Sequence, residues 1–154
     1  MNIFNKIKTD HQEARDIMDN IIKTRDNDER FELFQQLKVA ILSHAKSEEK
    51  TFYKALNVNR ELKDETPHLK HEHKDAENIF HEIDKEKLNS PEWWEKFGEV
   101  RKALLHHMEE EEKEIFPEAR KEIDAERAKE LGEEMEELQE AIKPEIQEKQ
   151  DKAA

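Results

Sequence analysis

Residues 42–53 read LSHAKSEEKTFY, and residues 105–116 repeat the pattern as LHHMEEEEKEIF. Each copy places a histidine four residues before a glutamate, and residues at this spacing lie one above the other on a helix face. Apolar residues recur at the same period around them, so this face is predicted to be buried. Buried imidazole and carboxylate groups are costly unless something pairs with them. The two copies therefore indicate a metal site with more than one ion.

The composition limits the class of protein. The chain has 154 residues, which is typical of one domain, and its two glycines and four prolines allow long helices. It contains no cysteine, which excludes disulfides, thiolate ligands and iron–sulfur clusters. The net charge of −13 argues against nucleic acid or an anionic membrane as a partner. Because no apolar run approaches the roughly 20 residues of a membrane span and no secretory signal precedes the first helix, we expect a cytoplasmic protein.

Five helices are predicted from the apolar period and from the residues that interrupt it. The fourth has the clearest start, because Ser90 is a good N-cap and Pro91 suits the first helical position. Pro117 is expected to bend or end this helix, and Pro144 to break the fifth one ahead of a polar tail. The predicted helices cover roughly residues 2–24, 28–57, 67–87, 91–117 and 124–143.

The repeat extends over four of these helices. The second helix matches the fourth with a constant shift of 63 residues, and the first matches the third with a shift of 62. Short loops make neighbouring helices antiparallel. The sequence thus predicts an all-α fold, an antiparallel four-helix bundle built from a duplicated helical hairpin, with an extra C-terminal helix. Residues 1–123 would form the bundle, and residues 124–154 an acidic C-terminal helix and tail, through which an oligomer could form.

Six polar residues lie on the apolar faces of the four repeated helices. A lone histidine on such a face is usually a core residue, but here each helix carries one. Glutamate is rarely buried without a partner. The glutamates could instead lie where the seam opens to solvent, but Phe52 and Ile115 resume the apolar seam one turn further on. The six residues are His11, His44, Glu48, His73, His107 and Glu111.

The residue types indicate the kind of metal. Imidazole suits iron, zinc, copper and nickel, whereas carboxylates suit harder ions. Structural zinc sites usually take sets rich in cysteine. Four histidines with two glutamates therefore match two iron ions better than structural zinc, and manganese stays an alternative because it shares these ligands.

The pattern His…His-x-x-x-Glu…His…His-x-x-x-Glu on a duplicated hairpin resembles the hemerythrin-like (HHE cation-binding) domain. Phe116-Pro117 after the second motif is also typical of that family. The resemblance covers roughly residues 2 to 120. It implies a four-helix bundle that holds a non-haem di-iron centre and binds O₂, peroxide or NO. The four histidines would be its terminal ligands, and Glu48 and Glu111 its bridging carboxylates.

One position departs from the family pattern. Oxygen-carrying hemerythrins have a second histidine four residues after the one on the third helix, and here that residue is Glu77. Glu77 would be a seventh ligand or lie just outside the ligands, while an ordinary solvated position stays open. An added carboxylate would favour ferric iron, which shifts the expectation towards peroxide decomposition or sensing. Reversible binding or storage of O₂ or iron without turnover is the alternative, so whether the protein is an enzyme stays open.

Several further polar residues are predicted to lie outside the ligand set. Glu49 and Glu112 repeat between the two copies but belong to acidic runs, so a solvated face is expected for both, with a place just outside the ligands as the alternative. Tyr53 is one position off the apolar seam and is expected to flank the core, with a hydrogen bond donated near the site as the alternative. His68, His71 and His106 are expected on the surface, and for His81 a place at the pocket rim is the alternative to an ordinary helix position.

Overall fold

The regular structure is helical throughout residues 1–153, the part of the chain that the computed structural model describes. Two π-helical turns each join an α-helix to the next one: η1 (Glu49–Tyr53) joins α2 to α3, and η2 (Glu111–Ile115) joins α5 to α6. The α-helices are α1 (Ile3–Lys23), α2 (Asn27–Glu48), α3 (Lys54–Asn57), α4 (Thr66–Asp84), α5 (Pro91–Glu110), α6 (Phe116–Glu122) and α7 (Ala125–Ala153).

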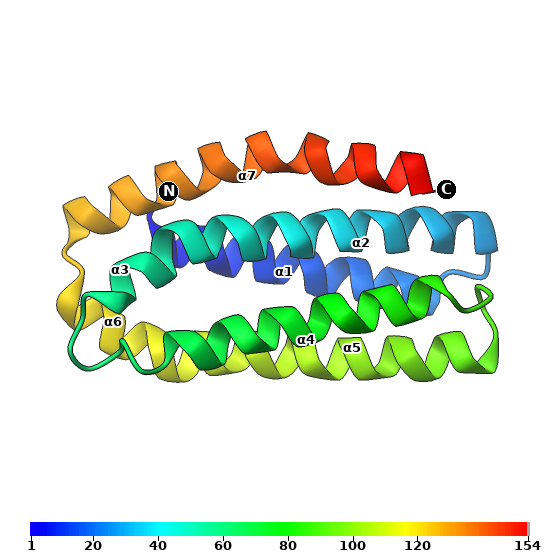
Figure 1. The fold of residues 1–154 in the computed structure, drawn as a ribbon, viewed down its shortest axis with the longest axis horizontal. Helices are drawn as coiled ribbons and strands as arrows, with labels where there is room; N and C mark the ends of the chain where they lie inside the picture. The colour runs from blue at the N-terminus through cyan, green and yellow to red at the C-terminus, as the bar shows by residue number, and fades with distance from the viewer. Residues whose placement is uncertain (154) are drawn as a thin grey trace.

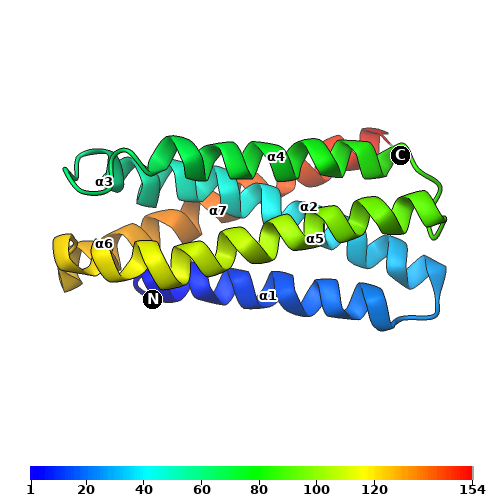
Figure 2. The same ribbon diagram turned by 90° about the horizontal axis from the view of Figure 1, so that it is seen from below.

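The four long helices α1, α2, α4 and α5 form an antiparallel bundle of two hairpins (Figure 1). α1 packs on α2, and α4 packs on α5. α7 lies outside the bundle along α2 and α1. Figure 1 shows it on the side away from α5, and in the view of Figure 2 it lies behind the bundle. The predicted all-α bundle with an extra C-terminal helix is confirmed. None of the helices within residues 1–153 is long and apolar enough to cross a bilayer.

Side-chain caps start the helices where the sequence indicates. The Ser90 hydroxyl accepts a hydrogen bond from the Trp93 N–H at 3.2 Å, and Pro91 occupies the first turn of α5. The Asn2 side chain likewise accepts from the Asn5 N–H at 2.8 Å at the start of α1. These caps satisfy backbone donors that have no partner within the helix. The predicted start of the fourth helix is confirmed.

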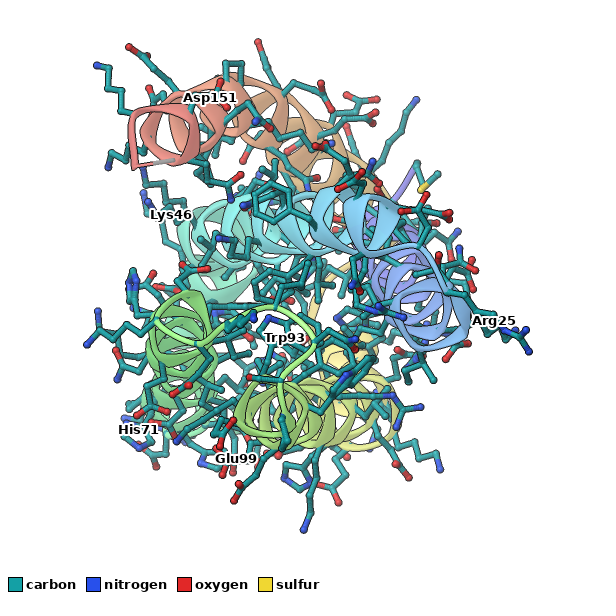
Figure 3. All side chains as sticks on the ribbon, turned by 90° about the vertical axis from the view of Figure 1, so that its right-hand side faces the viewer. Arg25, Lys46, His71, Trp93, Glu99 and Asp151 are labelled. Carbon is teal, nitrogen blue, oxygen red and sulfur yellow. The ribbon has the colours of Figure 1, made fainter. Side chains whose placement is uncertain are left out.

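The apolar core is divided by a polar layer. At one end Trp93 stacks on Phe97 with ring centroids 5.3 Å apart, and Figure 3 shows Trp93 between the helices. At the other end Phe4 packs edge-on against Phe52 and Phe116 at 5.9 and 5.2 Å. Both clusters are fully or almost fully buried. The histidines and glutamates of the repeat therefore lie in the middle of the bundle, with apolar packing above and below.

Both π turns change which residues face the core. A π turn bonds residue i to i+5, so it adds one residue to the turn. In η1 the consecutive residues Thr51, Phe52 and Tyr53 are consequently all buried. A constant α-helical period, from which buried positions are predicted in a sequence, does not account for this extra residue. π turns are frequent at functional sites, and here the same turn occurs in both copies of the repeat.

The prediction that Pro144 breaks the last helix is wrong, because α7 continues to Ala153 and replaces the predicted tail. Ile142 and Ile146 are buried on either side of Pro144, which is itself exposed. Packing of both flanking turns holds the helix together, and the hydrogen bond that proline cannot donate is lost at a solvent-facing position. The apolar face of α7 is thus covered by α1 and α2 of the same chain.

The N-terminus packs tightly against α7 at Gly132. A Cβ atom at this position would overlap the Met1 carbonyl oxygen and lie 2.6 Å from the Asn2 carbonyl carbon. Gly98 offers a matched control, since a Cβ there would meet nothing within 4 Å. We expect Gly132→Ala to destabilise the protein by roughly 1–3 kcal/mol through overpacking. Gly98→Ala should stabilise it by up to about 1 kcal/mol through helix propensity. Urea unfolding of both variants measures this, and a stabilising Gly132→Ala would contradict the close packing of α7.

Candidate metal centre

Four helices each contribute one histidine to the polar layer. Each histidine lies on the apolar face of its helix, so its ring points into the bundle. The two glutamates lie one turn after the histidines of α2 and α5, at the junctions with the π turns. Both glutamate side chains are 0% exposed. The structure brings together His11 of α1, His44 and Glu48 of α2, His73 of α4, His107 of α5 and Glu111 at the start of η2.

Glu111 lies between one histidine of each hairpin. Its Oε1 atom is 3.3 Å from Nε2 of His11 and 3.3 Å from Nε2 of His107. Tyr53 contacts the other carboxylate oxygen of Glu111 at 2.8 Å. A carboxylate in this position can reach two ions, one beside each histidine.

Glu48 has the equivalent place on the opposite side of the layer. Its Oε1 atom is 3.4 Å from Nε2 of His44 and 3.1 Å from Nε2 of His73. The histidine rings form two close pairs, with centroids 5.2 Å apart for His11 and His44 and 4.6 Å apart for His73 and His107. Each pair can hold one ion, and each glutamate then spans the two pairs.

Several polar atoms in this layer have no hydrogen-bond partner among the described residues. They are Nε2 of His11 and of His44, both carboxylate oxygens of Glu48, and Oε1 of Glu111. A buried polar atom without a partner costs on the order of 1–3 kcal/mol. Divalent cations held between the histidine pairs would give these five atoms partners, because nitrogen and carboxylate oxygen are metal donors. The residues present therefore fit a metal site.

Two carboxylates each bind the Nδ1 atom of a histidine in their own hairpin. Asp10 Oδ2 is 2.8 Å from Nδ1 of His44, and Glu72 Oε1 is 2.8 Å from Nδ1 of His107. Lys6 binds the other oxygen of Asp10 at 2.9 Å. Each of these acids directly precedes the histidine of its own helix, so the repeated acid–histidine dipeptides were the sequence signal for them.

Two further carboxylates hold histidines of the opposite hairpin. Glu112 Oε2 is 2.8 Å from Nδ1 of His11, and Glu49 Oε2 is 2.9 Å from Nδ1 of His73. Their side chains are only 21% and 34% exposed. The prediction of a solvated face for both residues is wrong, because the neighbouring hairpin covers them and supplies an imidazole partner. Their exact repetition between the two copies was the signal for this role.

These four carboxylates fix the orientation of the histidine rings and determine which ring nitrogen carries the proton. A carboxylate that accepts a hydrogen bond from Nδ1–H leaves the lone pair of Nε2 free for a metal and sets the plane of the ring. Burial by itself lowers the pKa of His44, but the charge of Glu48 and the hydrogen bond with Asp10 outweigh burial and raise the pKa to about 10. The pocket thus has a strong excess of negative charge, which favours a cation.

Tyr53 belongs to the site, although the sequence period placed it beside the core. Its hydroxyl donates to Glu111 and lies 3.2 Å from Nε2 of His107 and 3.3 Å from Nε2 of His73. Burial and the charges of Glu111 and Glu48 hold the pKa of the phenol well above its usual value. Tyr53 therefore stays protonated and can donate a hydrogen bond into the site.

Glu77 lies at the side of the site and not among the converging atoms. Its carboxylate accepts a hydrogen bond from Lys74 at 2.8 Å, and its side chain is 28% exposed. The hydrogen bond from Lys74 lowers the pKa of Glu77. Arg15, which matches Glu77 in the other repeat, binds Glu112 at 2.9 Å. A ligand role for Glu77 requires its release from Lys74 and stays a prediction.

A cavity of about 230 Å³ opens beside the polar layer between α2, α4 and α5. The four histidines form its floor, and Leu42, Leu104 and Met108 supply apolar walls. Charged residues including Lys74 and Glu77 also line it. His81 lies elsewhere, in a larger groove bounded by α2, α4 and α7. The cavity is large enough for a small molecule to reach the histidines.

Comparisons with known proteins agree with this geometry. The family model of the hemerythrin HHE cation binding domain matches residues 2–119. The fold is similar to the crystal structure of a hemerythrin HHE cation binding domain-containing protein from Mycobacterium kansasii, with a TM-score of 0.81 and 22% sequence identity over 94% of this chain and 89% of that chain. A search of curated proteins found no match. The resemblance drawn from the sequence is confirmed, and the chain belongs to the hemerythrin HHE cation binding domain family.

Proposed function

We propose that this protein is a non-haem di-iron protein that binds O₂, peroxide or NO in its cavity and decomposes peroxide. The observation that carries the proposal is the convergence of four imidazole Nε2 atoms on two buried carboxylates beside a small cavity. Membership of a cation-binding family supports the presence of metal.

The donor set supports two ions and favours iron. His11 and His44 would hold one ion, and His73 and His107 the other, with the two glutamates shared between them. Two groups of donor atoms, each within 4.8 Å, have Glu48 in common. Imidazole suits iron, whereas manganese prefers oxygen donors, so four imidazoles against two carboxylates favour iron.

The chain's own residues would bind and orient the small molecule. Bound iron would supply Lewis acidity and redox change. Leu42, Leu104 and Met108 would give the small molecule apolar walls, and Tyr53 holds a proton at its hydroxyl beside Glu111. Disproportionation of two hydrogen peroxide molecules to two waters and one O₂ balances without an external reductant.

Elemental analysis with an oxygen electrode tests the proposal. Protein expressed with ample iron should contain two iron ions per chain and release O₂ when hydrogen peroxide is added. One ion or none would contradict the dinuclear centre. Two ions without O₂ release would contradict peroxide decomposition and favour storage or sensing.

Glu77 provides the test of turnover against reversible binding. Once released from Lys74, the Glu77 carboxylate would add an anionic donor that stabilises ferric iron, so the reduced wild type should oxidise quickly in air. Glu77→His restores the residue of the oxygen-carrying hemerythrins and should prolong reversible O₂ uptake. Stopped-flow absorption of the reduced protein mixed with O₂, followed by degassing, measures both. Glu77→Gln separates the loss of charge from the gain of an imidazole.

A stable and reversible O₂ complex in the wild type, unchanged in Glu77→His, would contradict this role. Glu77 would then serve only as the partner of Lys74, and reversible binding without turnover would be the better function.

A further inference from the structure

Besides His73–Glu77 beside the central layer, the His-x-x-x-Glu spacing occurs at two further places, on the outer side of α4 and α5. His68 precedes Glu72 by four residues on α4, and His106 precedes Glu110 by four residues on α5. We propose that these four residues form a second, peripheral cation site that takes a transition ion such as Zn²⁺. The site is separate from the central layer, since none of its imidazoles belongs to that layer.

The two helices bring both imidazoles onto the same two carboxylates. His68 Nε2 is 3.0 Å from Glu110 Oε1 and 3.5 Å from Glu72 Oε2. His106 Nε2 is 3.2 Å from Glu110 Oε2 and 3.4 Å from Glu72 Oε2. Each histidine thus contacts the glutamate of its own helix and that of the facing helix. Such crossed pairing arises because α4 and α5 are antiparallel neighbours with their motifs at the same level.

The spacing suits a tetrahedral ion. Zinc binds histidine nitrogen and carboxylate oxygen at about 2.0–2.2 Å, so the donor atoms around it lie about 3.4 Å apart. The four separations between nitrogen and oxygen, from 3.0 to 3.5 Å, bracket this distance. His68, Glu72 and Glu110 already offer donor atoms that all lie within 4.8 Å of one another. Rotation of the exposed His106, which contacts both glutamates, would bring in the fourth donor.

Burial favours metal capture over simple ion pairing. The carboxylates of Glu72 and Glu110 are 15% and 12% exposed, whereas the imidazoles of His68 and His106 are 51% and 68% exposed. The helix pair therefore fixes the carboxylates in place, and the imidazoles can close over an ion that arrives from solvent. Two nitrogen and two oxygen donors suit zinc and its neighbours, whereas calcium takes six to eight oxygens.

Glu72 connects the peripheral site to the central one. Its Oε1 atom is 2.8 Å from Nδ1 of His107, while its Oε2 atom faces His68 and His106. A peripheral ion would bind the oxygen that the central histidine does not use. The two sites would then share one carboxylate, which gives the peripheral ion a direct route to influence the orientation of His107.

Calorimetric titration of the purified full-length protein with Zn²⁺ tests the proposal. Wild type should bind one Zn²⁺ per chain that the double variant His68→Ala/His106→Ala binds at least about 100-fold more weakly. His71→Ala is the matched control and should change the affinity by less than about twofold. His71 also lies outside on α4 (Figure 3), with Asp75 one turn on at 3.4 Å, but α5 offers it no imidazole among the described residues.

Equal Zn²⁺ affinity in wild type and the double variant would overturn the proposal, as would an equal loss in His71→Ala. Co²⁺ gives a second readout, because its visible absorption intensifies in a four-coordinate site and should do so only in chains that keep both imidazoles. If the central site takes up Zn²⁺, it does so in wild type and variants alike. The difference between them therefore reports the peripheral site whether or not the centre holds iron, and circular dichroism checks that each variant folds.

Discussion

Glu111→Ala is expected to weaken binding of the central metal by more than about 100-fold and to leave the purified protein largely free of iron. Glu111 is fully buried between His11 and His107, with its oxygen 3.3 Å from both Nε2 atoms. Its loss removes a donor from both proposed ions at once. Metal content after dialysis against a weak chelator measures the effect.

Neighbouring glutamates give a graded control for this variant. Glu112→Ala should lose about 10- to 100-fold in affinity, because it removes only the hydrogen-bond partner of His11 Nδ1. Glu109→Ala should keep full metal content, since Glu109 pairs with Lys113 on the exposed surface at 2.7 Å. Equal metal loss in Glu111→Ala and Glu109→Ala would show that the central site is not where the metal binds.

Chelated, metal-free protein is expected to lose stability as the pH rises from 6.5 to about 10. Burial lowers the pKa of His44, but Glu48 and Asp10 outweigh it and raise the pKa to about 10 in the folded state, against 6.5 for the free side chain. The folded chain therefore keeps a proton that the unfolded chain releases. This stabilisation is fully present below pH 6.5 and is lost as pH rises through about 10. The expected loss is on the order of a few kcal/mol.

The metal-loaded protein should show the opposite trend. Metal binding needs neutral imidazole, so protons compete with the ion and the stabilisation by metal grows as pH rises. Urea unfolding of both forms across this pH range measures the difference. His44→Gln should flatten the slope of the metal-free form, whereas His81→Gln, at an exposed position, should not. A metal-free stability that stays constant over this range would contradict the charged pairing of His44.

The period of the apolar residues and the internal repeat predicted most of the fold. The helix starts at Asn2 and Ser90 follow from capping chemistry that is local to a few residues. The repeat predicted two antiparallel hairpins because a duplicated amphipathic pair can bury its faces only against a similar pair. The same repeat indicated six polar residues that the structure brings within one layer. The structure places Glu77 apart from them, bound to Lys74.

Other features depend on contacts between segments far apart in the chain. The sequence predicts Glu49 and Glu112 to be solvated, because both lie outside the apolar face of their own segment. In the structure each forms a hydrogen bond with a histidine of the opposite hairpin. Tyr53 enters the site because the π turn adds a residue, which a constant period cannot represent. α7 continues past Pro144 because the bundle holds the turns on both sides.

The sequence by itself determined the helices, their pairing and the residue types that face inward, because periodicity and capping are local properties. Only the tertiary structure decided which carboxylate stands behind each imidazole and where the cavity opens. It likewise decided that His68 and His106 share two glutamates. These features depend on the register between packed helices, in which a shift of one residue turns a side chain by about 100° to another face. Packing of whole helices sets that register, and a local pattern within one helix does not contain it.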